Sequence, residues 1–348
     1  MDLFSNYALF VIKTLTVMLV LIVLSAVIIS MTLRKRHESG RLKLTNLGER
    51  YRTMKHDMQL GRMKPRQQKF WHKAYKKKES LKAKREKKNF KSGMSAPQKP
   101  VLYVIDFKGG IEANEVASLR EEISAVLAVA APQDQVLVRL ESRGGVVHGY
   151  GLAASQLQRL RDREIGLTVV IDKVAASGGY MMACVANHIV AAPFAIIGSI
   201  GVVAQIPNFH RLLQRNDIDI ELHTAGQYKR TLTLLGENSE EGRQKFRADL
   251  NRTHHLFKEF VHQMRPELNI EQVATGEHWY GTEALEKGLI DAINTSDDII
   301  INHIDEYDVI AVHYAHRKKM IERFTQSSGE SLERLLLRLW QRMRLPLQ

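Results

Sequence analysis

Hydrophobic and polar positions divide the 348-residue chain into zones with different patterns. Residues 14–33 form an uncharged run dominated by Leu, Val and Ile. As a helix this run would be about 30 Å long, which matches the hydrocarbon thickness of a bilayer. Residues 34–99 contain few aliphatic residues, and from Val101 onward short apolar runs alternate with amphipathic segments. We therefore expect an N-terminal membrane anchor in residues 1–33, a basic and partly helical linker over 34–99 and a folded body over 100–315.

The apolar run is interpreted as an uncleaved anchor rather than a secretory signal or a buried helix. Arg34, Lys35 and Arg36 stand where a signal peptidase would need small residues. A buried helix of this length is not normally apolar on every face. The basic residues that follow favour a cytoplasmic C-terminal side, although the positive-inside rule weakens when a long domain follows the span. The charge pattern therefore leaves the orientation open.

The body alternates predicted strands with predicted helices, which is typical of α/β proteins with a mainly parallel sheet. In chain order we expect a strand at 101–107, a helix at 112–130, a strand at 135–141, a helix at 150–163 and a strand at 167–172. A strand-like pattern follows at 218–224 and a long charged helix at 240–264. The uncharged stretch 189–207 contains two prolines and two glycines, so we interpret it as two buried strands and a turn rather than a second span.

The positive charge of the chain is concentrated in one segment. The net charge is +13, but residues 34–99 hold 23 Lys and Arg against 5 Asp and Glu, and the remainder is mildly acidic. Basic residues beside a span favour a solvated spacer or contact with anionic lipid headgroups. Phe70, Trp71, Tyr75 and Phe90 lie among the lysines, which leaves nucleic-acid binding as a less favoured alternative. We expect membrane lipids as partners and do not expect nucleic acid.

The cysteine and histidine content argues against metal chemistry. Cys184 is the only cysteine, which excludes an internal disulfide and any multi-cysteine zinc or iron–sulfur site. His188 follows Cys184 at i+4, yet a small apolar residue on a buried helix is the better interpretation of this cysteine. No His-Glu-x-x-His spacing occurs. We expect neither a metal nor another cofactor.

Glycine pairs follow two of the predicted strands. Gly144 and Gly145 come just after the strand at 135–141, where two residues without side chains leave backbone N–H groups able to hold an oxyanion. Ser177 precedes Gly178 and Gly179 after the strand at 167–172. This serine is either a simple helix N-cap or a nucleophile at a helix N-terminus, where the Gly178 N–H would help hold a tetrahedral intermediate.

A nucleophilic serine needs a base, and no histidine–acid pair stands in a motif context. Lys229, in the sequence Gln227-Tyr228-Lys229, is the natural candidate, although a single lysine is usually a surface residue. To act as a base, its amine has to be uncharged, which requires burial and suitable neighbours.

Residues 174–183, the sequence Gly198-Ser199-Ile200-Gly201-Val202 and the motif at 227–229 together resemble the signal peptide peptidase A family of membrane-anchored serine peptidases. The resemblance covers essentially the whole chain and is strongest to the shorter bacterial members. It implies a ClpP/crotonase-like spiral of ββα units and a Ser–Lys dyad, with Ser177 as nucleophile and Lys229 as general base. It further implies that Ser199 orients the lysine, and that the oxyanion or substrate site includes Gly144, Gly145 and Gly178.

The family often has Ser-Pro-Gly-Gly where this chain has Ser142-Arg143-Gly144-Gly145, so Arg143 frees a dihedral that proline would fix. The resemblance implies a homo-oligomer whose neighbouring subunits help complete the site. It also implies a bacterial inner-membrane location with the body on the periplasmic side, which conflicts with the charge rule.

The function we expect is that of a membrane-anchored serine endopeptidase, which hydrolyses signal-peptide remnants or unfolded segments through an acyl-enzyme. Two alternatives stay open. A crotonase-like acyl-CoA enzyme would share the paired oxyanion donors but has no use for a serine–lysine pair. A non-enzymatic membrane scaffold would depend on the basic segment alone.

The last residues, 316–348, predict a basic amphipathic helix. Leucines together with Trp340 and Met343 recur at helical spacing, while Arg334, Arg338 and Arg342 form a separate stripe. Such a helix suits a membrane surface or a neighbouring subunit.

Overall fold

The structure is a computed structural model that describes residues 13–16, 18–20, 22, 40–91 and 99–315. The chain divides into two units, and residues 42–314 form the larger one, which contains the folded body. Most of the predicted anchor at 14–33 and all of the predicted helix at 316–348 lie outside the described residues. Within the described ranges, no helix combines the length and the apolar character that a membrane span requires.

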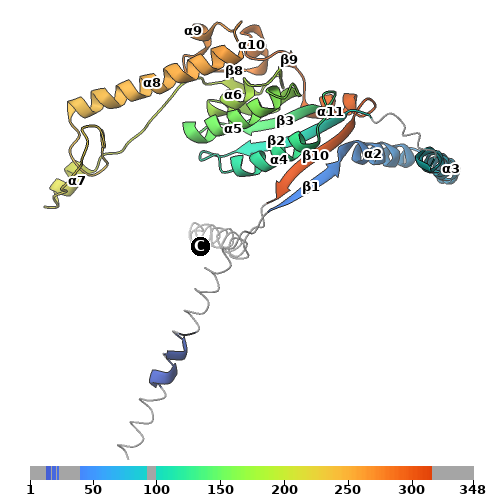
Figure 1. Cartoon of the computed structure of the whole chain (residues 1–348), viewed down its shortest axis with the longest axis horizontal. Helices are drawn as coiled ribbons and strands as arrows, with labels where there is room; N and C mark the ends of the chain where they lie inside the picture. Colours follow the sequence, from blue (N-terminus) through green and yellow to red (C-terminus); the bar gives the residue numbers. More distant parts are fainter. Residues whose placement is uncertain (1–12, 17, 21, 23–39, 92–98, 316–348) are drawn as a thin grey trace, which may run out of the picture. The chain divides into compact units, whose positions relative to one another are not determined.

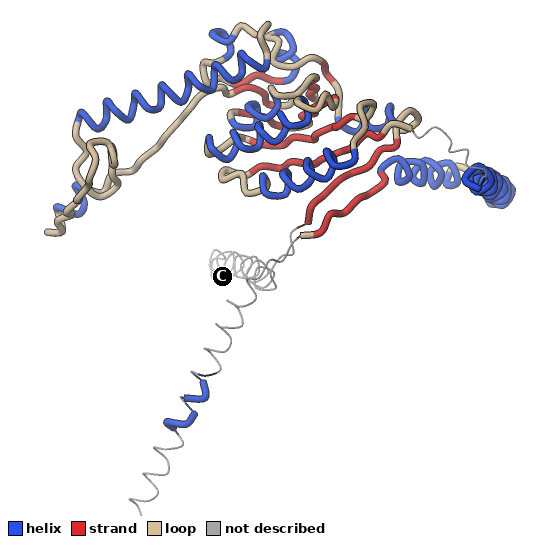
Figure 2. Tube along the Cα trace, viewed as in Figure 1, coloured by secondary structure: helices blue, strands red, loops and turns tan. Residues whose placement is uncertain are grey.

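A ten-stranded sheet organises the larger unit. Figures 1 and 2 show its strands beside the helices that cover it. Its strands are β1 (Arg41–Asn46), β2 (Val101–Gly109), β3 (Gln135–Ser142), β4 (Gly166–Ile171), β5 (Val174–Ala176), β6 (His188–Ala191), β7 (Ile196–Gly198), β8 (His278–Tyr280), β9 (Ala292–Ile293) and β10 (Asp308–Ala315). The helices of this unit are α2 (Leu47–Gly61), α3 (Pro65–Lys91), α4 (Val116–Val129), α5 (Val147–Arg161), α6 (Gly178–Ala183), α7 (His210–Gln214), α8 (Glu240–Met264), α9 (Ile270–Val273), α10 (Gly281–Glu286) and α11 (Ser296–His303).

The sheet is mainly parallel. Its main path runs β1-β10-β2-β3-β4-β6-β9, and the five pairs from β10/β2 to β6/β9 are parallel. A branch leaves this path, because β5 pairs with both β3 and β7, and β7 pairs antiparallel with β8. Parallel neighbours require crossover connections, which the intervening helices supply. The prediction of an α/β body with a mainly parallel sheet is confirmed.

The apolar pattern located most elements of the body. The strands predicted at 101–107, 135–141 and 167–172 are β2, β3 and β4, and the predicted long helix is α8. The uncharged stretch 189–207 contains β6 and β7. The strand expected at 218–224 does not form, and that segment is exposed irregular chain. Its alternating pattern is correct for a strand, but no strand of the described chain lies beside it to complete the hydrogen bonds.

The segment expected to be a linker contributes ordered structure to the body. β1 extends the sheet beside β10. Asn46 caps α2 by accepting the Glu49 N–H at 2.8 Å, and Leu47 is buried. The Tyr51 hydroxyl donates to Asp297 on α11 at 3.1 Å, which ties α2 to the body.

Alternate residues of the central strands point to opposite faces of the sheet, and each face packs in its own apolar cluster. Ile105 and Val138 belong to the larger cluster, which α4, α5 and α6 cover on one face (Figure 1). Val104 and Leu137 belong to the second cluster on the opposite face, together with Ile300 of α11. This period of two, with both faces apolar, is the pattern of a sheet that is covered on both sides.

One part of the unit projects from the sheet. Phe257 and Val261 bury the C-terminal half of α8 in the core, while its N-terminal half extends away from the sheet towards α7 (Figure 1). We call residues 202–238, which precede α8, the arm. Large apolar side chains are exposed along it, including Val203 at 90%, Leu212 at 55% and Leu222 at 53%.

Candidate active site

Ser177 occupies a strained turn between β5 and α6. Its backbone has φ 51° and ψ −119°, a region that non-glycine residues rarely adopt. The Ser177 N–H donates to the Gly198 carbonyl at 2.7 Å, and its own carbonyl accepts the Met181 N–H at 3.0 Å. The side chain does not cap α6. The N-cap interpretation is therefore wrong, and the half-buried hydroxyl has no structural role at the helix start.

The glycine loop after β3 lies directly against this turn. Gly144 has φ +85°, and a Cβ built on it would lie 2.8 Å from the Ser177 Cβ and 2.7 Å from the Gly178 nitrogen. Gly145 is as crowded, since its Cβ would lie 1.9 Å from the Ile111 carbonyl oxygen. Because β3 pairs with β5 at Ser142 and Ala175, the sheet itself brings the two loops together. Only glycine permits this approach of backbone to backbone.

The backbone N–H groups of these loops differ in availability. The Gly144 N–H donates to the Ser142 hydroxyl oxygen at 3.1 Å. Among the described residues, neither the Gly145 N–H nor the Gly178 N–H donates to a protein acceptor. Gly145 and Gly178 therefore offer free donors beside Ser177, whereas Gly144 shapes the loop.

A buried hydroxyl network supports the glycine loop. The Tyr150 hydroxyl donates to the Gly110 carbonyl at 2.7 Å, and the Ser142 hydroxyl donates to the Gly109 carbonyl at 3.1 Å. Tyr150 is fully buried, and a Cβ on Gly178 would lie 2.4 Å from its ring. One tyrosine of α5 thus contacts both loops of the candidate site. Sequence reasoning missed it, because nothing in the local pattern separates Tyr150 from an ordinary core tyrosine.

Ser199 repeats the geometry of Ser177 one strand further along. Ala176 and Gly198 are register partners of β5 and β7, so Ser177 and Ser199 follow neighbouring parallel strands. Ser199 also has φ 51°, and its N–H donates to the Glu277 carbonyl at 2.7 Å. Its half-buried side chain makes only a long hydrogen bond, from Oγ to the Gly276 carbonyl at 3.4 Å. The structure thus brings Ser177, Ser199 and the three glycines to one end of the sheet.

Lys229 lies apart from this group, on the exposed arm. Its N–H donates to the Gly226 carbonyl at 3.1 Å, and its neighbour Tyr228 stacks under the Lys245 ammonium of α8, 5.4 Å from the ring centre. Within the described residues, no hydrogen bond or ion pair joins the Lys229 amine to Ser177 or Ser199. The predicted dyad therefore stays a prediction for a single copy of the chain.

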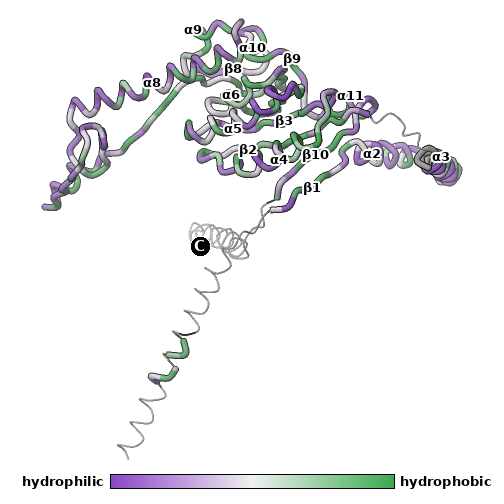
Figure 3. Tube along the Cα trace, viewed as in Figure 1, coloured by the Kyte–Doolittle hydropathy of each residue, from purple (hydrophilic) through white to green (hydrophobic). Residues whose placement is uncertain are grey.

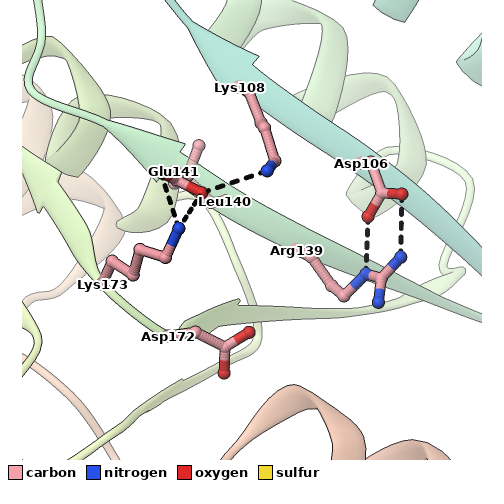
Figure 4. Close-up of a pocket in the computed structure, with 7 residues that line it drawn as sticks. All are labelled: Asp106, Lys108, Arg139, Leu140, Glu141, Asp172 and Lys173. Atoms are coloured by element: carbon pink, nitrogen blue, oxygen red, sulfur yellow. Dashed lines mark hydrogen bonds and ion pairs between the residues drawn. The ribbon is translucent and has the colours of Figure 1, made fainter.

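A second polar site lies at the carboxyl ends of β2, β3 and β4, as Figure 4 shows. This cavity of about 270 Å³ is lined mainly by charged side chains. Arg139 donates to both carboxylate oxygens of Asp106, at 2.5 and 2.8 Å, and Glu141 accepts from Lys108 and Lys173 at 3.4 and 3.3 Å. Burial acts to raise the pKa of Glu141, but the two lysines outweigh it and lower that pKa. The charges are mutually compensated, so the cavity is a paired ionic surface.

Cys184 and His188 do not form a catalytic pair. Cys184 is fully buried, and its thiol donates to the Met181 carbonyl at 3.3 Å. Burial raises the pKa of this thiol, which keeps it protonated and unreactive. The His188 ring pairs instead with Asp291 at 3.6 Å. Over the described residues, no group of His, Cys, Asp and Glu side chains has the geometry of a metal site.

Two protein-family models match consecutive parts of the chain. The model described as "Peptidase family S49 N-terminal" covers residues 2–157, and the model described as "Peptidase family S49" covers residues 159–309. The glycine loop lies in the first range, while Ser177, Ser199 and Lys229 lie in the second.

Curated proteins that are similar to this chain are also named as proteases. A "Probable protease SohB" of Buchnera aphidicola subsp. Schlechtendalia chinensis is 55% identical over 307 residues, which is 87% of this chain and 100% of that protein. A protein of the same name from Haemophilus influenzae is 48% identical, covering 95% of this chain and 94% of its own length. Among solved structures, a lysine mutant of the "1510-N membrane-bound stomatin-specific protease" with a substrate peptide aligns with TM-score 0.42 at 14% identity, over 66% of this chain and 99% of that chain.

Proposed function

Because this chain belongs to peptidase family S49, we propose that it cleaves peptide bonds as a serine endopeptidase with Ser177 as its nucleophile. The family match confirms the resemblance predicted from the motifs, and the chain is therefore a peptidase. The serine mechanism, the Ser–Lys dyad, the ClpP/crotonase-type spiral and the membrane anchor are parts of the proposal.

One observation carries the assignment of the nucleophile. Ser177 is held with φ 51° in a turn where its hydroxyl caps nothing, and two unpaired backbone donors lie beside it. Strain of this kind costs about 1–3 kcal/mol and persists where the surrounding structure imposes it. Gly144, which has no side chain, approaches Ser177 so closely that a Cβ built on it would lie 2.8 Å from the Ser177 Cβ. This arrangement suits a carbonyl that is attacked by the serine and held by its oxygen.

In the proposed reaction, Lys229 carries one proton from the Ser177 hydroxyl to the leaving amine. Neutral Lys229 takes the proton of the Ser177 hydroxyl as its oxygen bonds to the substrate carbonyl carbon, and Ser199 orients the amine. The resulting oxyanion accepts hydrogen bonds from the free N–H groups of Gly145 and Gly178. The protonated lysine then donates its proton to the leaving amine as the C–N bond breaks. Water, activated by the same amine, hydrolyses the acyl-enzyme and releases Ser177.

We propose that the lysine comes from a neighbouring copy in a homo-oligomer. Lys229 lies on the arm, which exposes large apolar side chains such as Leu222 at 53% and Leu235 at 43%. Burial of these side chains against another copy would remove the arm from water and supply the shielded surroundings that an uncharged amine needs. The strand pattern at 218–224, which finds no partner within the described chain, is consistent with pairing between copies.

We further propose that the uncharged run at 14–33 anchors the peptidase in the bacterial inner membrane, where it cleaves unfolded segments or signal-peptide remnants. The support is the length and composition of the run. Protease added to spheroplasts will degrade the body if it faces the periplasm and spare it if it faces the cytoplasm.

A fluorophosphonate probe tests the nucleophile directly, because it forms a covalent bond only with an activated serine. We expect the wild-type protein to be labelled and to hydrolyse casein, and Ser177→Ala to do neither. Ser155→Ala is the matched control, since that exposed hydroxyl only donates to the Gly151 carbonyl of its own helix. If Ser177→Ala hydrolysed casein at the wild-type rate, the proposed function would be wrong.

A further inference from the structure

The inner face of α3 packs against α2 through aromatic and polar side chains. Trp71 and Tyr75 stack on each other, with ring centres 5.5 Å apart, and both contact the His56 ring of α2 at 4.6 and 4.2 Å. Gln68 donates to the Leu60 carbonyl at 3.0 Å. These contacts fix which side of α3 faces α2 and which side faces away from it.

The opposite side of α3 forms a continuous exposed stripe. Phe70, Lys73, Lys77, Leu81 and Lys84 recur every three or four residues, so they share one helix face. Phe70 is 80% exposed and Leu81 is 57% exposed, although both are large apolar side chains. We call these five residues the outer stripe. The outer stripe therefore combines two exposed apolar side chains with three lysines on one helix face.

The charge of α3 is predominantly positive. α3 contains twelve Lys and Arg against two Glu, and no acidic residue occurs between Asp57 and Glu79. Figure 3 shows α2, which packs against α3, as mostly hydrophilic. Within the described residues, none of the three stripe lysines forms a salt bridge. Their charge is therefore available to an anionic partner.

We propose that the outer stripe binds the surface of an anionic phospholipid bilayer, with its lysines at the headgroups and Phe70 and Leu81 inserted among them. Lysines attract anionic headgroups, and interleaved apolar side chains gain by entering the interface. A nucleic-acid backbone would satisfy the lysines but offers no apolar layer for Leu81. The stripe would hold the body at a fixed orientation on the membrane.

Chain length supports a membrane as the partner. The inference rests on the proposed anchor at 14–33, after which only seven residues precede β1. Fully extended, seven residues span at most about 25 Å. An anchored chain therefore keeps the start of β1 near the headgroups, and β1 leads along the chain into α2 and α3. The anchor supplies proximity, and the outer stripe supplies orientation.

The test uses the full chain in nanodiscs and measures how close α3 lies to the lipid. Ala74 is exposed and borders the outer stripe, so a fluorophore on Ala74→Cys, in a Cys184→Ala background, reports contact through quenching by doxyl-labelled lipid. We expect strong quenching in discs with about 30% phosphatidylglycerol, weak quenching in phosphatidylcholine discs, and reversal by 0.5 M salt (about a 4–5 Å Debye length). A fluorophore on Val129→Cys, 69% exposed at the end of α4, is expected to be unaffected.

Charge variants separate the outer stripe from general electrostatics. Each lysine is expected to change the equilibrium constant for surface binding about fivefold, so K73Q/K77Q/K84Q should lower that constant by about 100-fold. R120Q/R163Q/R252Q removes the same charge from exposed positions elsewhere on the body and should retain the quenching.

Equal quenching in both lipids, or equal loss in both triple variants, would overturn the proposal. So would protection of α3 by duplex DNA at physiological salt with no response to phosphatidylglycerol. Incorporation into phosphatidylcholine discs tests the anchor separately, and casein hydrolysis by K73Q/K77Q/K84Q separates a failure of this inference from a failure of the proposed peptidase activity.

Discussion

The phenolic oxygen of Tyr150 lies 2.5 Å from the Ser142 hydroxyl oxygen, and that serine oxygen also accepts the Gly144 N–H. This pair connects α5 to the end of β3 and to the loop that lies against Ser177. Only two hydroxyl protons are available for three contacts, namely the pair itself and the Gly109 and Gly110 carbonyls, so the network has no spare donor. Removing either hydroxyl leaves a buried acceptor without a partner.

Tyr150→Phe tests whether this network positions the glycine loop. The variant keeps the ring against Gly178 but removes the donor to the Gly110 carbonyl, which should cost about 1–3 kcal/mol of stability. We expect kcat on a peptide substrate to fall by about 10–100-fold with KM nearly unchanged, because a displaced donor weakens only the oxyanion.

Tyr180→Phe is the matched control for that variant. Tyr180 is also fully buried, and its hydroxyl donates to the Leu289 carbonyl at 2.8 Å, away from the glycine loop. Thermal unfolding should show a similar loss of stability, while kcat should stay within about twofold of wild type. Equal losses of kcat in the two variants would mean that the Tyr150 network acts only through stability.

Ser177→Gly is expected to make the protein more stable and inactive at once. Glycine adopts φ 51° and ψ −119° at little cost, so the change relieves about 1–3 kcal/mol of backbone strain in the folded protein. The greater freedom of glycine in the unfolded chain lowers the free energy of unfolding by about 0.5–1 kcal/mol, so the net effect is a gain in stability. Ser177→Ala keeps the strain and should unfold at the wild-type temperature. The comparison of these two variants by differential scanning calorimetry isolates the backbone effect.

Glu164→Gly provides the contrast. Glu164 also has a positive φ, 57°, but it lies in an exposed turn after α5. This variant should gain less stability than Ser177→Gly and retain full peptidase activity. A Ser177→Gly protein that was no more stable than Ser177→Ala would contradict the strained-turn interpretation.

The apolar pattern predicted those parts of the fold whose cause is local. β2, β3 and β4 are mostly apolar, because both faces of the central sheet are covered, and α8 carries a clear amphipathic period. The turns at Gly144 and Ser177 were also predictable, since glycine pairs after buried strands mark positions where backbone approaches backbone.

Features that depend on distant pairs could not be predicted. Asp106 and Arg139 pair across β2 and β3, yet each looks like an ordinary polar residue in its own strand. Tyr150 supports the glycine loop only because β2 ends beside β3, which brings the Gly110 carbonyl and the Ser142 hydroxyl within reach of its hydroxyl. β1 has a weak pattern, with most of its residues exposed, and only its position beside β10 makes it a strand. In each case the information lies in the register of the sheet rather than in the local sequence.

Glu122 should make the stability of the body depend on pH. It lies on α4, is 2% exposed and accepts the Tyr314 N–H at 2.7 Å, with the His313 ring 3.5 Å away. Burial raises its pKa to about 7, against the opposing effect of the Tyr314 N–H. The folded protein therefore binds this proton more tightly than the unfolded chain, and stability falls as pH rises from about 4.5 to about 7.

Glu122→Gln removes that proton and keeps an acceptor for the Tyr314 N–H. Relative to this variant, the wild-type protein should lose roughly 1–3 kcal/mol between pH 5 and pH 8, seen as a drop of several degrees in its melting temperature. Glu121→Gln, at the exposed neighbouring position, should follow the wild-type pH dependence. If the difference between wild type and Glu122→Gln were constant over this range, Glu122 would not be the group responsible.

Mixed assemblies test whether Lys229 acts on the Ser177 of another copy. Ser177→Ala and Lys229→Met are each expected to be inactive alone. If the dyad forms between copies, random co-assembly pairs an intact serine with an intact neighbouring lysine at about a quarter of the sites, and that share of casein hydrolysis should return. The control is the double variant Ser177→Ala/Lys229→Met mixed with wild type. It supplies neither residue of the dyad, so it can only lower the activity of the wild-type copies. If activity never returned in the co-assembled variants, the dyad would not form between copies. The arm would then have to fold back so that Lys229 reaches Ser177 within one chain. The exposed apolar side chains of the arm would need another explanation.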